Sequence, residues 1–403
     1  MKPGKAEALT VLQLIHGMKL GGAEKVVRHI ASGLRDEGLR PVVCGWHTGG
    51  DQADLLAAEG ITIAPPLADA RGWRRLLVPG HLHRIVKAHG VGLIHAHMSD
   101  SAVWALLLHW LSGRPFVITH HNANLIDAIV TRYAWYRWLR HALVHFCARR
   151  ADLNIAVSET VREVLMDEAG LAPDQVRFVP NGVPLPHEGT VEEARKHRLA
   201  RASDGFTTPD VDPMVLYMGR FVAQKTLDVL IDALPDLLAR FPKARVVLLG
   251  EGPEGEALKA QAENLGVAQA IDWPGRVDDV TPWLESADLL VLPSRVEGLP
   301  MVVLEAMAWA LPVVASDIPS NRELIGDDAF GWLSRQGDPA DLARAMIAAL
   351  EQPKETDRRV EGALALMREN YSIAAVARQH VLVYESVLQS LNGKPGAAAG
   401  PSA

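Results

Sequence analysis

Short apolar runs recur along this chain, and each is followed by a glycine or polar turn and then by apolar residues at helical spacing. This alternation is typical of βαβ units, in which helices connect parallel strands. The first run, residues 8–15, leads into a glycine turn at 17–24 and a helix that continues through Leu34. Further strands are predicted at 41–45, 93–96, 116–119, 153–157, 215–218, 245–249, 270–273, 289–292 and 312–315. We therefore expect an α/β fold with parallel sheets.

A break near residues 181–213 divides this alternation in two. Prolines there surround a charged stretch with little strand pattern. A chain of 403 residues also exceeds the size at which a single hydrophobic core keeps growing. The predicted boundaries are 1–185 for an N-terminal Rossmann-like domain, 186–212 for a linker, 213–372 for a C-terminal Rossmann-like domain, 373–391 for a helix that crosses back onto the N-terminal domain, and 392–403 for a disordered tail.

Composition excludes several classes of protein. The net charge of -7 and the absence of a nucleic-acid-binding motif argue against a DNA- or RNA-binding protein. Two cysteines, Cys44 and Cys147, are too few for a disulfide framework. The polar N-terminus lacks the apolar core of a secretion signal, and no apolar run is long enough to span a bilayer. A cytoplasmic protein is expected, with any membrane contact peripheral and on the inner face.

A loop and helix at residues 293–308 carry two glutamates. Glu297 follows a predicted strand, and Glu305 lies about two turns into a helix that begins near Pro300. Carboxylates accept hydrogen bonds from sugar hydroxyls, and the free amides of a helix N-terminus favour an anion such as a diphosphate. A charged loop and a solvated helix face would also produce this spacing. The apolar neighbours of Glu305 favour the binding site.

Two cations follow another predicted strand. Arg220 and Lys225 would emerge at its carboxyl end, where ligands bind in open α/β sheets. Arginine grips phosphate oxygens bidentately, and lysine neutralises them as a point charge. Either residue alone is an ordinary surface cation. With Glu297 and Glu305 across one crevice, they would complete a nucleoside diphosphate site.

Taken together, these residues resemble glycosyltransferase family 4, the retaining enzymes of the GT-B fold with two facing Rossmann-like domains. The resemblance spans nearly the whole chain. It rests on the order of its motifs, which are GGAE at 21–24, VPNGV at 179–183, Gly219-Arg220 with Lys225, GEGP at 250–253, and Glu297 to Pro300 with Glu305. Two positions depart from the family pattern, because Thr226 and Ala310 stand where glycine is common. Neither replaces a ligand.

The resemblance implies a role for each matched residue. Arg220 and Lys225 neutralise the donor diphosphate, Glu305 binds the ribose hydroxyls, and Glu297 contacts the transferred sugar. Backbone groups of the glycine turns and of the helix start complete the donor site, namely Gly21, Gly22, Gly219, Gly250, Glu251, Gly298, Leu299, Pro300 and Met301. The turn at Gly21 and Gly22 has an equally good second interpretation, namely a turn that only leads into a helix and binds no ligand.

Histidines gather at the ends of two predicted N-terminal strands. His95 and His97 alternate at one strand end, and His120 and His121 follow the other. All four are candidates for lining the cleft, with His95, His97 and His120 on its acceptor side, although a structural role is the commoner one for histidine. The family places a histidine after this second strand beside the reacting sugar. The spacing from Thr119 assigns that position to His121, which we expect to be catalytic with Glu297, Arg220 and Lys225.

No metal site or cofactor is expected. HExxH is absent, and the aspartates most like a metal-binding DxD pair, Asp210 and Asp212, lie in the proline-rich linker. Residues 132–150 combine aromatic and arginine side chains, which is compatible with a helix on an anionic membrane. A buried helix with a cationic solvent face is the favoured alternative.

The expected reaction moves a hexosyl group from a nucleoside diphosphate sugar to an acceptor hydroxyl, with a glycan or lipid-linked glycan as acceptor. Domain closure would exclude water from the donor. A nucleotide-sugar epimerase, a sugar phosphorylase and a non-catalytic sugar-nucleotide-binding subunit are the alternatives.

Overall fold

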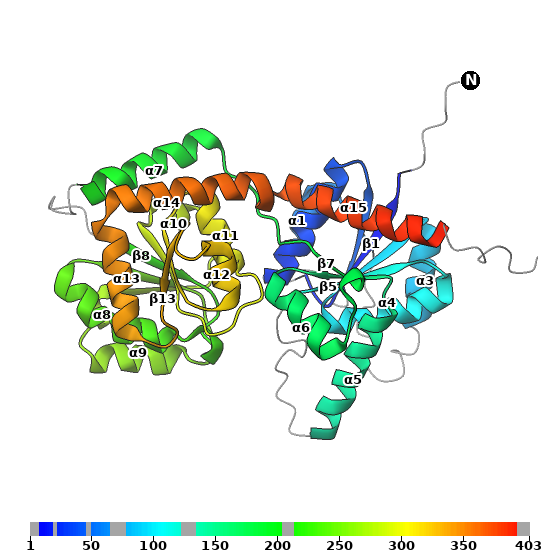
Figure 1. The fold of residues 1–403 in the computed structure, drawn as a ribbon, viewed down its shortest axis with the longest axis horizontal. Coiled ribbons are helices and arrows are strands. Elements are labelled where there is room, and N and C mark those ends of the chain that lie inside the picture. Colours follow the sequence, from blue (N-terminus) through cyan, green and yellow to red (C-terminus); the bar gives the residue numbers. More distant parts are fainter. Residues whose placement is uncertain are drawn as a thin grey trace, which may run out of the picture. The chain divides into compact units, whose positions relative to one another are not determined.

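The computed structural model describes residues 8–18, 22–45, 50–64, 78–121, 134–203 and 213–392. They form two compact units (Figure 1). The N-terminal unit comprises Met1–Gly182 and Ile373–Ala403, and the C-terminal unit comprises Val183–Ser372. Each unit is a parallel sheet with helices on both faces.

The N-terminal sheet has seven strands in the order β3-β2-β1-β4-β5-β6-β7. All its neighbouring pairs are parallel, and its central strands are buried on both faces, as expected when helices cover both sides. The elements are β1 (Thr10–Ile15), α1 (Gly22–Asp36), β2 (Arg40–Gly45), α2 (Asp51–Ala58), β3 (Thr62–Ile63), α3 (Val78–Ala88), β4 (Leu93–His97), α4 (Met98–Ser112), β5 (Phe116–His120), α5 (Ala134–Arg150), β6 (Leu153–Ala156), α6 (Glu159–Ala169), η2 (Pro173–Gln175) and β7 (Val176–Phe178).

The C-terminal sheet has six strands in the order β10-β9-β8-β11-β12-β13, again parallel throughout. Its elements are α7 (Glu188–Ser203), β8 (Met214–Met218), η3 (Ala223–Lys225), α8 (Leu227–Arg240), β9 (Arg245–Leu249), α9 (Gly255–Asn264), η4 (Ala268–Ala270), β10 (Ile271–Gly275), α10 (Thr281–Ser286), β11 (Leu289–Leu292), α11 (Met301–Ala308), β12 (Val313–Ser316), α12 (Pro319–Ile325), β13 (Trp332–Ser334), α13 (Pro339–Glu351), α14 (Pro353–Leu366) and η5 (Met367–Tyr371).

Every strand that the sequence predicts is present, and the structure adds three. The added strands β3, β7 and β13 contain two or three residues and lie at sheet edges. An apolar run this short carries no periodicity, so neighbouring strands define these edges more than their own sequence does.

The stretch expected as a linker differs from the prediction, because helix α7 occupies most of it and packs on α14 and α10 within the C-terminal unit. The buried side chain of Arg198 fixes this helix. Its guanidinium donates hydrogen bonds to five backbone carbonyls, those of Leu284, Glu285, Ala287, Trp309 and Ala310. Helix α7 contains few apolar residues, so hydrophobic periodicity in the sequence does not reveal this anchoring.

Replacing Arg198 by methionine will lower the free energy of unfolding by about 2 kcal/mol, because buried carbonyls then lose their donor while the volume is largely kept. Urea unfolding of the two proteins measures the difference. Lys196→Met is the matched control, since Lys196 lies on the same helix with its side chain 71% exposed. Equal stability of the R198M protein and the wild type would contradict this role for Arg198.

The C-terminal segment belongs to the N-terminal unit as helix α15 (Ile373–Asn392). It packs closely on α1, where a Cβ added at Gly33 would lie 2.6 Å from Cβ of Ala377. Residues 393–403, expected as a disordered tail, lie outside the described residues. Among the helices that the structure describes, none combines the length and apolarity needed to cross a membrane.

Candidate functional site

The C-terminal unit has its topological switch point between β8 and β11, because β9 and β10 lie on one side of this pair and β12 and β13 on the other. Ligands of open α/β sheets bind outside the carboxyl ends of the strands at such a point. The loops after β8 and β11 carry Arg220, Lys225 and Glu297. The predicted donor residues therefore lie where this fold places ligands.

Lys225 and Glu297 meet across the switch point. Nζ of Lys225 lies 2.5 Å from Oε1 of Glu297, with the two side chains 15% and 10% exposed. Two more contacts join the same loops, since Arg295 N donates to Gln224 O at 3.0 Å and Thr226 Oγ1 donates to Pro293 O. The ion pair with Glu297 therefore fixes Lys225, and the two hydrogen bonds hold the two loops together.

Backbone conformation explains both departures from the family pattern. Thr226 has a φ of 45° and Ala310 a φ of 51°, which is the left-handed region that glycine adopts most easily. Thr226 compensates with the hydrogen bond from its hydroxyl to Pro293. The chain therefore keeps the backbone shape that glycine would favour there.

The loops after β8 and β9 touch through their backbones. Gly250 has a φ of 140°, and a Cβ there would lie 1.8 Å from the carbonyl oxygen of Gly219. Phe221 N donates to Glu251 O at 2.9 Å beside this contact. Only glycine fits at position 250, which explains the GEGP motif.

Helix α11 begins at Met301, with Pro300 as its N-cap. The sequence predicts a helix that begins near Pro300, and the observed start agrees with this to one residue. Gly298, Leu299 and Pro300 are buried, and Glu305 is half-buried on the helix. The helix N-terminus immediately follows the loop that carries Glu297.

The N-terminal unit buries a connected histidine network at its own switch point, between β1 and β4. His95 and His97 on β4 are fully buried. His95 is hydrogen-bonded to Tyr384 Oη at 2.7 Å and to Thr119 Oγ1 at 2.6 Å. His97 bonds Gln13 Oε1 through Nε2 and His121 Nε2 through Nδ1, at 2.5 and 3.2 Å.

Burial sets the protonation state of this network. It lowers the pKa of His121 to about 3 and that of His380 to about 4, and the pKa values of His95 and His97 lie well below their usual range. Burial is the main cause in each case. The imidazoles are therefore neutral near pH 7.

Neutral rings fix the direction of the hydrogen bonds. Because the Gln13 oxygen accepts, His97 Nε2 carries its proton and Nδ1 accepts from His121 Nε2–H. His121 Nδ1 is then an acceptor, and it is buried without a hydrogen-bond partner within the described part of the chain. The network presents a lone pair at His121.

Comparison with known proteins identifies the family. Residues 202–364 match the family model for glycosyl transferases group 1, and residues 20–186 match that for glycosyltransferase family 4. A phosphatidyl-myo-inositol mannosyltransferase of Mycobacterium leprae (strain TN) is 34% identical over 306 residues, which are 74% of each chain. That of Mycobacterium tuberculosis (strain ATCC 25618 / H37Rv) is 30% identical over 383 residues, 92% of this chain and 94% of its own. The chain belongs to glycosyltransferase family 4.

Solved structures agree with the fold of this family 4 glycosyltransferase. HepE of Anabaena, solved in complex with UDP, superposes with a TM-score of 0.76 at 22% identity, over 94% of this chain and 100% of its own. The expected GT-B fold, built from two Rossmann-like domains with parallel sheets, is confirmed.

The structure gathers some predicted site residues of this glycosyltransferase and separates others. Lys225 and Glu297 are in contact, and His95, His97 and His121 share one network. His120 lies apart from that network: its Nε2 bonds Asn154 Oδ1 at 3.0 Å on β6. Successive strand residues point to opposite faces, so His120 and His121 cannot both join the cluster. Gly21 lies outside the described residues, and Gly22 starts α1.

Sequence reasoning missed several residues that hold these sites. Gln13 is a polar residue inside an apolar strand, and His380 and Tyr384 stand four residues apart on the last helix. Both patterns were visible signals. Tyr217 gave no signal, yet its buried hydroxyl donates to the Arg220 carbonyl at 3.2 Å. Burial raises the pKa of Tyr217, and the charge of Glu297 raises it further against the opposing effect of Arg220.

Replacing Gly250 by alanine will lower the free energy of unfolding by about 2 to 3 kcal/mol, through the clash with Gly219 and the unfavourable φ. Gly266→Ala is the matched control, because Gly266 has a φ of 70° with nothing within 4 Å of the added Cβ. We expect about 1 kcal/mol there. Urea titration separates the two, and equal losses would show that the contact between loops is unimportant.

Proposed function

We propose that this enzyme transfers a hexosyl group from a nucleoside diphosphate sugar to an acceptor hydroxyl, with retention of anomeric configuration and without a required divalent ion. The observation that carries the proposal is the Lys225–Glu297 pair at the switch point, one loop away from the N-terminus of α11. A cation and free helix amides at one sheet edge suit a diphosphate.

In the proposed donor complex, Lys225 and the exposed Arg220 neutralise the diphosphate, and Glu297 orients the lysine and contacts the sugar. Glu305 binds the ribose hydroxyls from the half-buried side of α11. The glycine contacts between the β8 and β9 loops hold backbone groups rigidly beside these side chains. His121 Nδ1 accepts a hydrogen bond from a sugar hydroxyl, since the network leaves that lone pair available.

The chemistry proposed for these residues is electrostatic. As the bond between the sugar and the diphosphate breaks, negative charge grows on the leaving phosphate, and the cations and helix amides stabilise it. The leaving phosphate accepts the proton of the incoming hydroxyl. No side chain is assigned as a nucleophile, because the carboxylate of Glu297 is engaged by Lys225.

A glycan or lipid-linked glycan is the proposed acceptor, supported by relatives named phosphatidyl-myo-inositol mannosyltransferase. Helix α5 supports a peripheral contact with the inner face of the membrane. Its described part buries Val144 and Cys147 on one side and exposes Leu143 and Phe146 on the other, followed by exposed Arg149 and Arg150. Cosedimentation with anionic vesicles, lost in a Leu143→Ser, Phe146→Ser variant, tests this contact.

The donor proposal is tested by thermal shift with UDP, GDP, ADP and their sugars in the presence of EDTA. A ligand that binds the native state raises Tm, so one base will stabilise the wild type by several degrees. Arg220→Ala, Lys225→Ala will lose the shift. The same shift in the double variant would place the nucleotide elsewhere, and no shift with any nucleotide would favour a non-catalytic role.

Product analysis separates the remaining functions. With the selected donor, NMR of the glycoside product will show the same anomeric configuration as in the donor sugar, which is retention. Epimerised donor formed without any acceptor would instead identify an epimerase, and tight binding without turnover would identify a sugar-nucleotide-binding subunit.

A further inference from the structure

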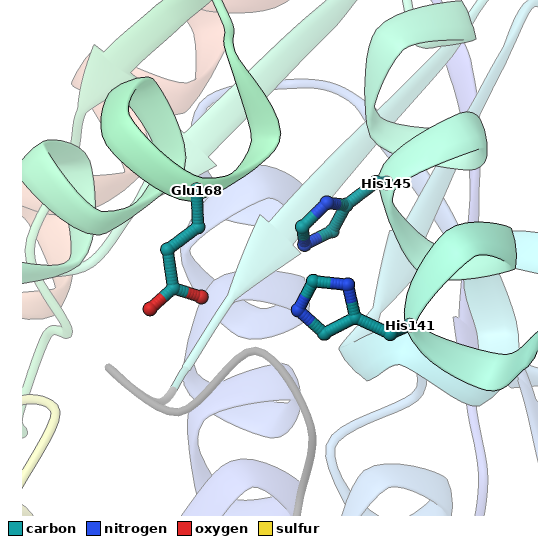
Figure 2. Close-up of side chains that lie close together, drawn as sticks. All are labelled: His141, His145 and Glu168. Atoms are coloured by element: carbon teal, nitrogen blue, oxygen red, sulfur yellow. The ribbon is translucent and has the colours of Figure 1, made fainter. Parts of the chain in front are cut away.

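Two histidines and a glutamate lie close together in the N-terminal unit, on helices α5 and α6. His141 and His145 lie four residues apart on α5 and so share one face of the helix, and Glu168 lies in the last turn of α6. Figure 2 shows both imidazole rings and the carboxylate pointing toward one another. One ligand atom from each residue lies within 4.8 Å of the others.

One nitrogen of the histidine pair is buried without a partner. His145 is 7% exposed, and its Nε2 is buried with no hydrogen-bond partner within the described part of the chain. Such a buried nitrogen is uncommon in native structures and calls for an explanation. The ring centroids of His141 and His145 are 3.9 Å apart. This close packing places the nitrogen atoms of both rings near one point, and the unpartnered Nε2 of His145 is available there as a ligand.

Glu168 supplies the negative charge. It is exposed, and it forms no ion pair among the residues that the structure describes. Arg149 of α5 is engaged by backbone rather than by this carboxylate, since its Nε donates to the carbonyl oxygen of Ala169 at 2.7 Å. The carboxylate therefore remains able to join the two imidazoles.

The geometry suits a transition-metal ion. Zinc binds histidine nitrogen and glutamate oxygen at about 2.0–2.2 Å, so ligand atoms in a tetrahedral site are about 3.4 Å apart. The three ligand atoms lie within 4.8 Å of one another, so binding an ion would require the side chains to rotate and bring these atoms closer together. Histidines at i and i+4 of a helix are also the spacing used in known helical zinc sites.

We infer that His141, His145 and Glu168 bind one divalent transition-metal ion of the zinc type, which clamps α5 to α6. Three protein ligands leave a fourth position for water. The ion would fix α5, which is the next helix after β5. It would thereby also help to fix His120 and His121 at the end of that strand. It takes no part in the transfer reaction proposed above, and its binding does not depend on that reaction.

Isothermal titration of the untagged, EDTA-treated full-length protein with Zn²⁺ tests the inference. We expect one ion per chain in the wild type, and Kd raised about tenfold or more in His141→Ala and in Glu168→Gln. Matched controls are His197→Ala on α7 and Glu163→Gln on α6, two exposed residues whose loss will leave Kd unchanged. Co²⁺ provides a second readout, because its visible absorption reports nitrogen and oxygen ligation.

The choice of variants distinguishes a folding defect from the loss of a metal ligand. His145→Ala empties a buried position and can unfold the helix, whereas Glu168→Gln alters only an exposed carboxylate. Far-UV circular dichroism confirms that each variant is folded. Absence of Zn²⁺ binding in the wild type, or an unchanged Kd in folded Glu168→Gln and His141→Ala, would overturn the inference.

Discussion

Replacing Lys225 by alanine will lower kcat/KM for sugar transfer by on the order of 10²- to 10³-fold, the usual loss when one preorganised group that stabilises developing charge is removed. The Lys225 side chain is 15% exposed, and its ammonium group is held by Glu297 at 2.5 Å. A charge fixed in a partly dehydrated site acts more strongly on a leaving diphosphate than a mobile surface charge does. Initial rates with the donor selected by thermal shift measure the effect.

A matched lysine serves as the control for this substitution. Lys259 lies in the same unit on α9, half exposed and paired with Glu256 at 3.0 Å. Its replacement by alanine will leave kcat/KM unchanged. Lys225→Arg keeps the charge and will recover part of the rate. Activity of the K225A enzyme within about threefold of the wild type would remove Lys225 from the mechanism.

Lowering the pH from about 7 to about 5 will strongly destabilise the N-terminal unit. Burial lowers the pKa of His29, His120 and His380 to about 4 and that of His121 to about 3. In the unfolded chain each histidine has a pKa near 6.5, so below about pH 6.5 it binds a proton that it does not bind in the folded state. The stability is therefore complete above about pH 6.5 and falls as the pH decreases toward about 4.

The expected slope is about 1.4 kcal/mol per pH unit for each such histidine, so four of them amount to several kcal/mol per pH unit. Urea unfolding between about pH 7 and pH 5 measures it, with hydrogen exchange, corrected for intrinsic rates, assigning the loss to one unit. The C-terminal unit is the internal control, because His187 and His197 are exposed.

Single variants check the origin of this pH dependence. His120→Gln will reduce the slope by about the contribution of one histidine, which is about 1.4 kcal/mol per pH unit, and His197→Gln will leave the slope unchanged. A slope near zero below about pH 6, or the same slope in both variants, would show that buried histidines do not control acid unfolding.

The candidate donor site was predictable because its residues follow strands with strong apolar runs. Once the strands ending at Met218 and Leu292 are recognised, the parallel sheet brings Lys225 and Glu297 to one edge. The histidine site was only half predictable. The spacing from Thr119 favoured His121, but His120 was also expected at the cleft, and the alternation of the strand separates the two.

Local patterns in the sequence by themselves determined the two parallel sheets, the loops that bear the donor residues and the glycines at their turns, because apolar periodicity and turn chemistry act over a few residues. Tertiary structure alone decided the short edge strands, the docking of α7 through Arg198, and the arrival of Tyr384 from α15 at His95. These features depend on burial and on hydrogen bonds between residues up to 289 positions apart. A polar residue such as Tyr384 is visible in the sequence, but no local pattern shows with which distant residue it pairs.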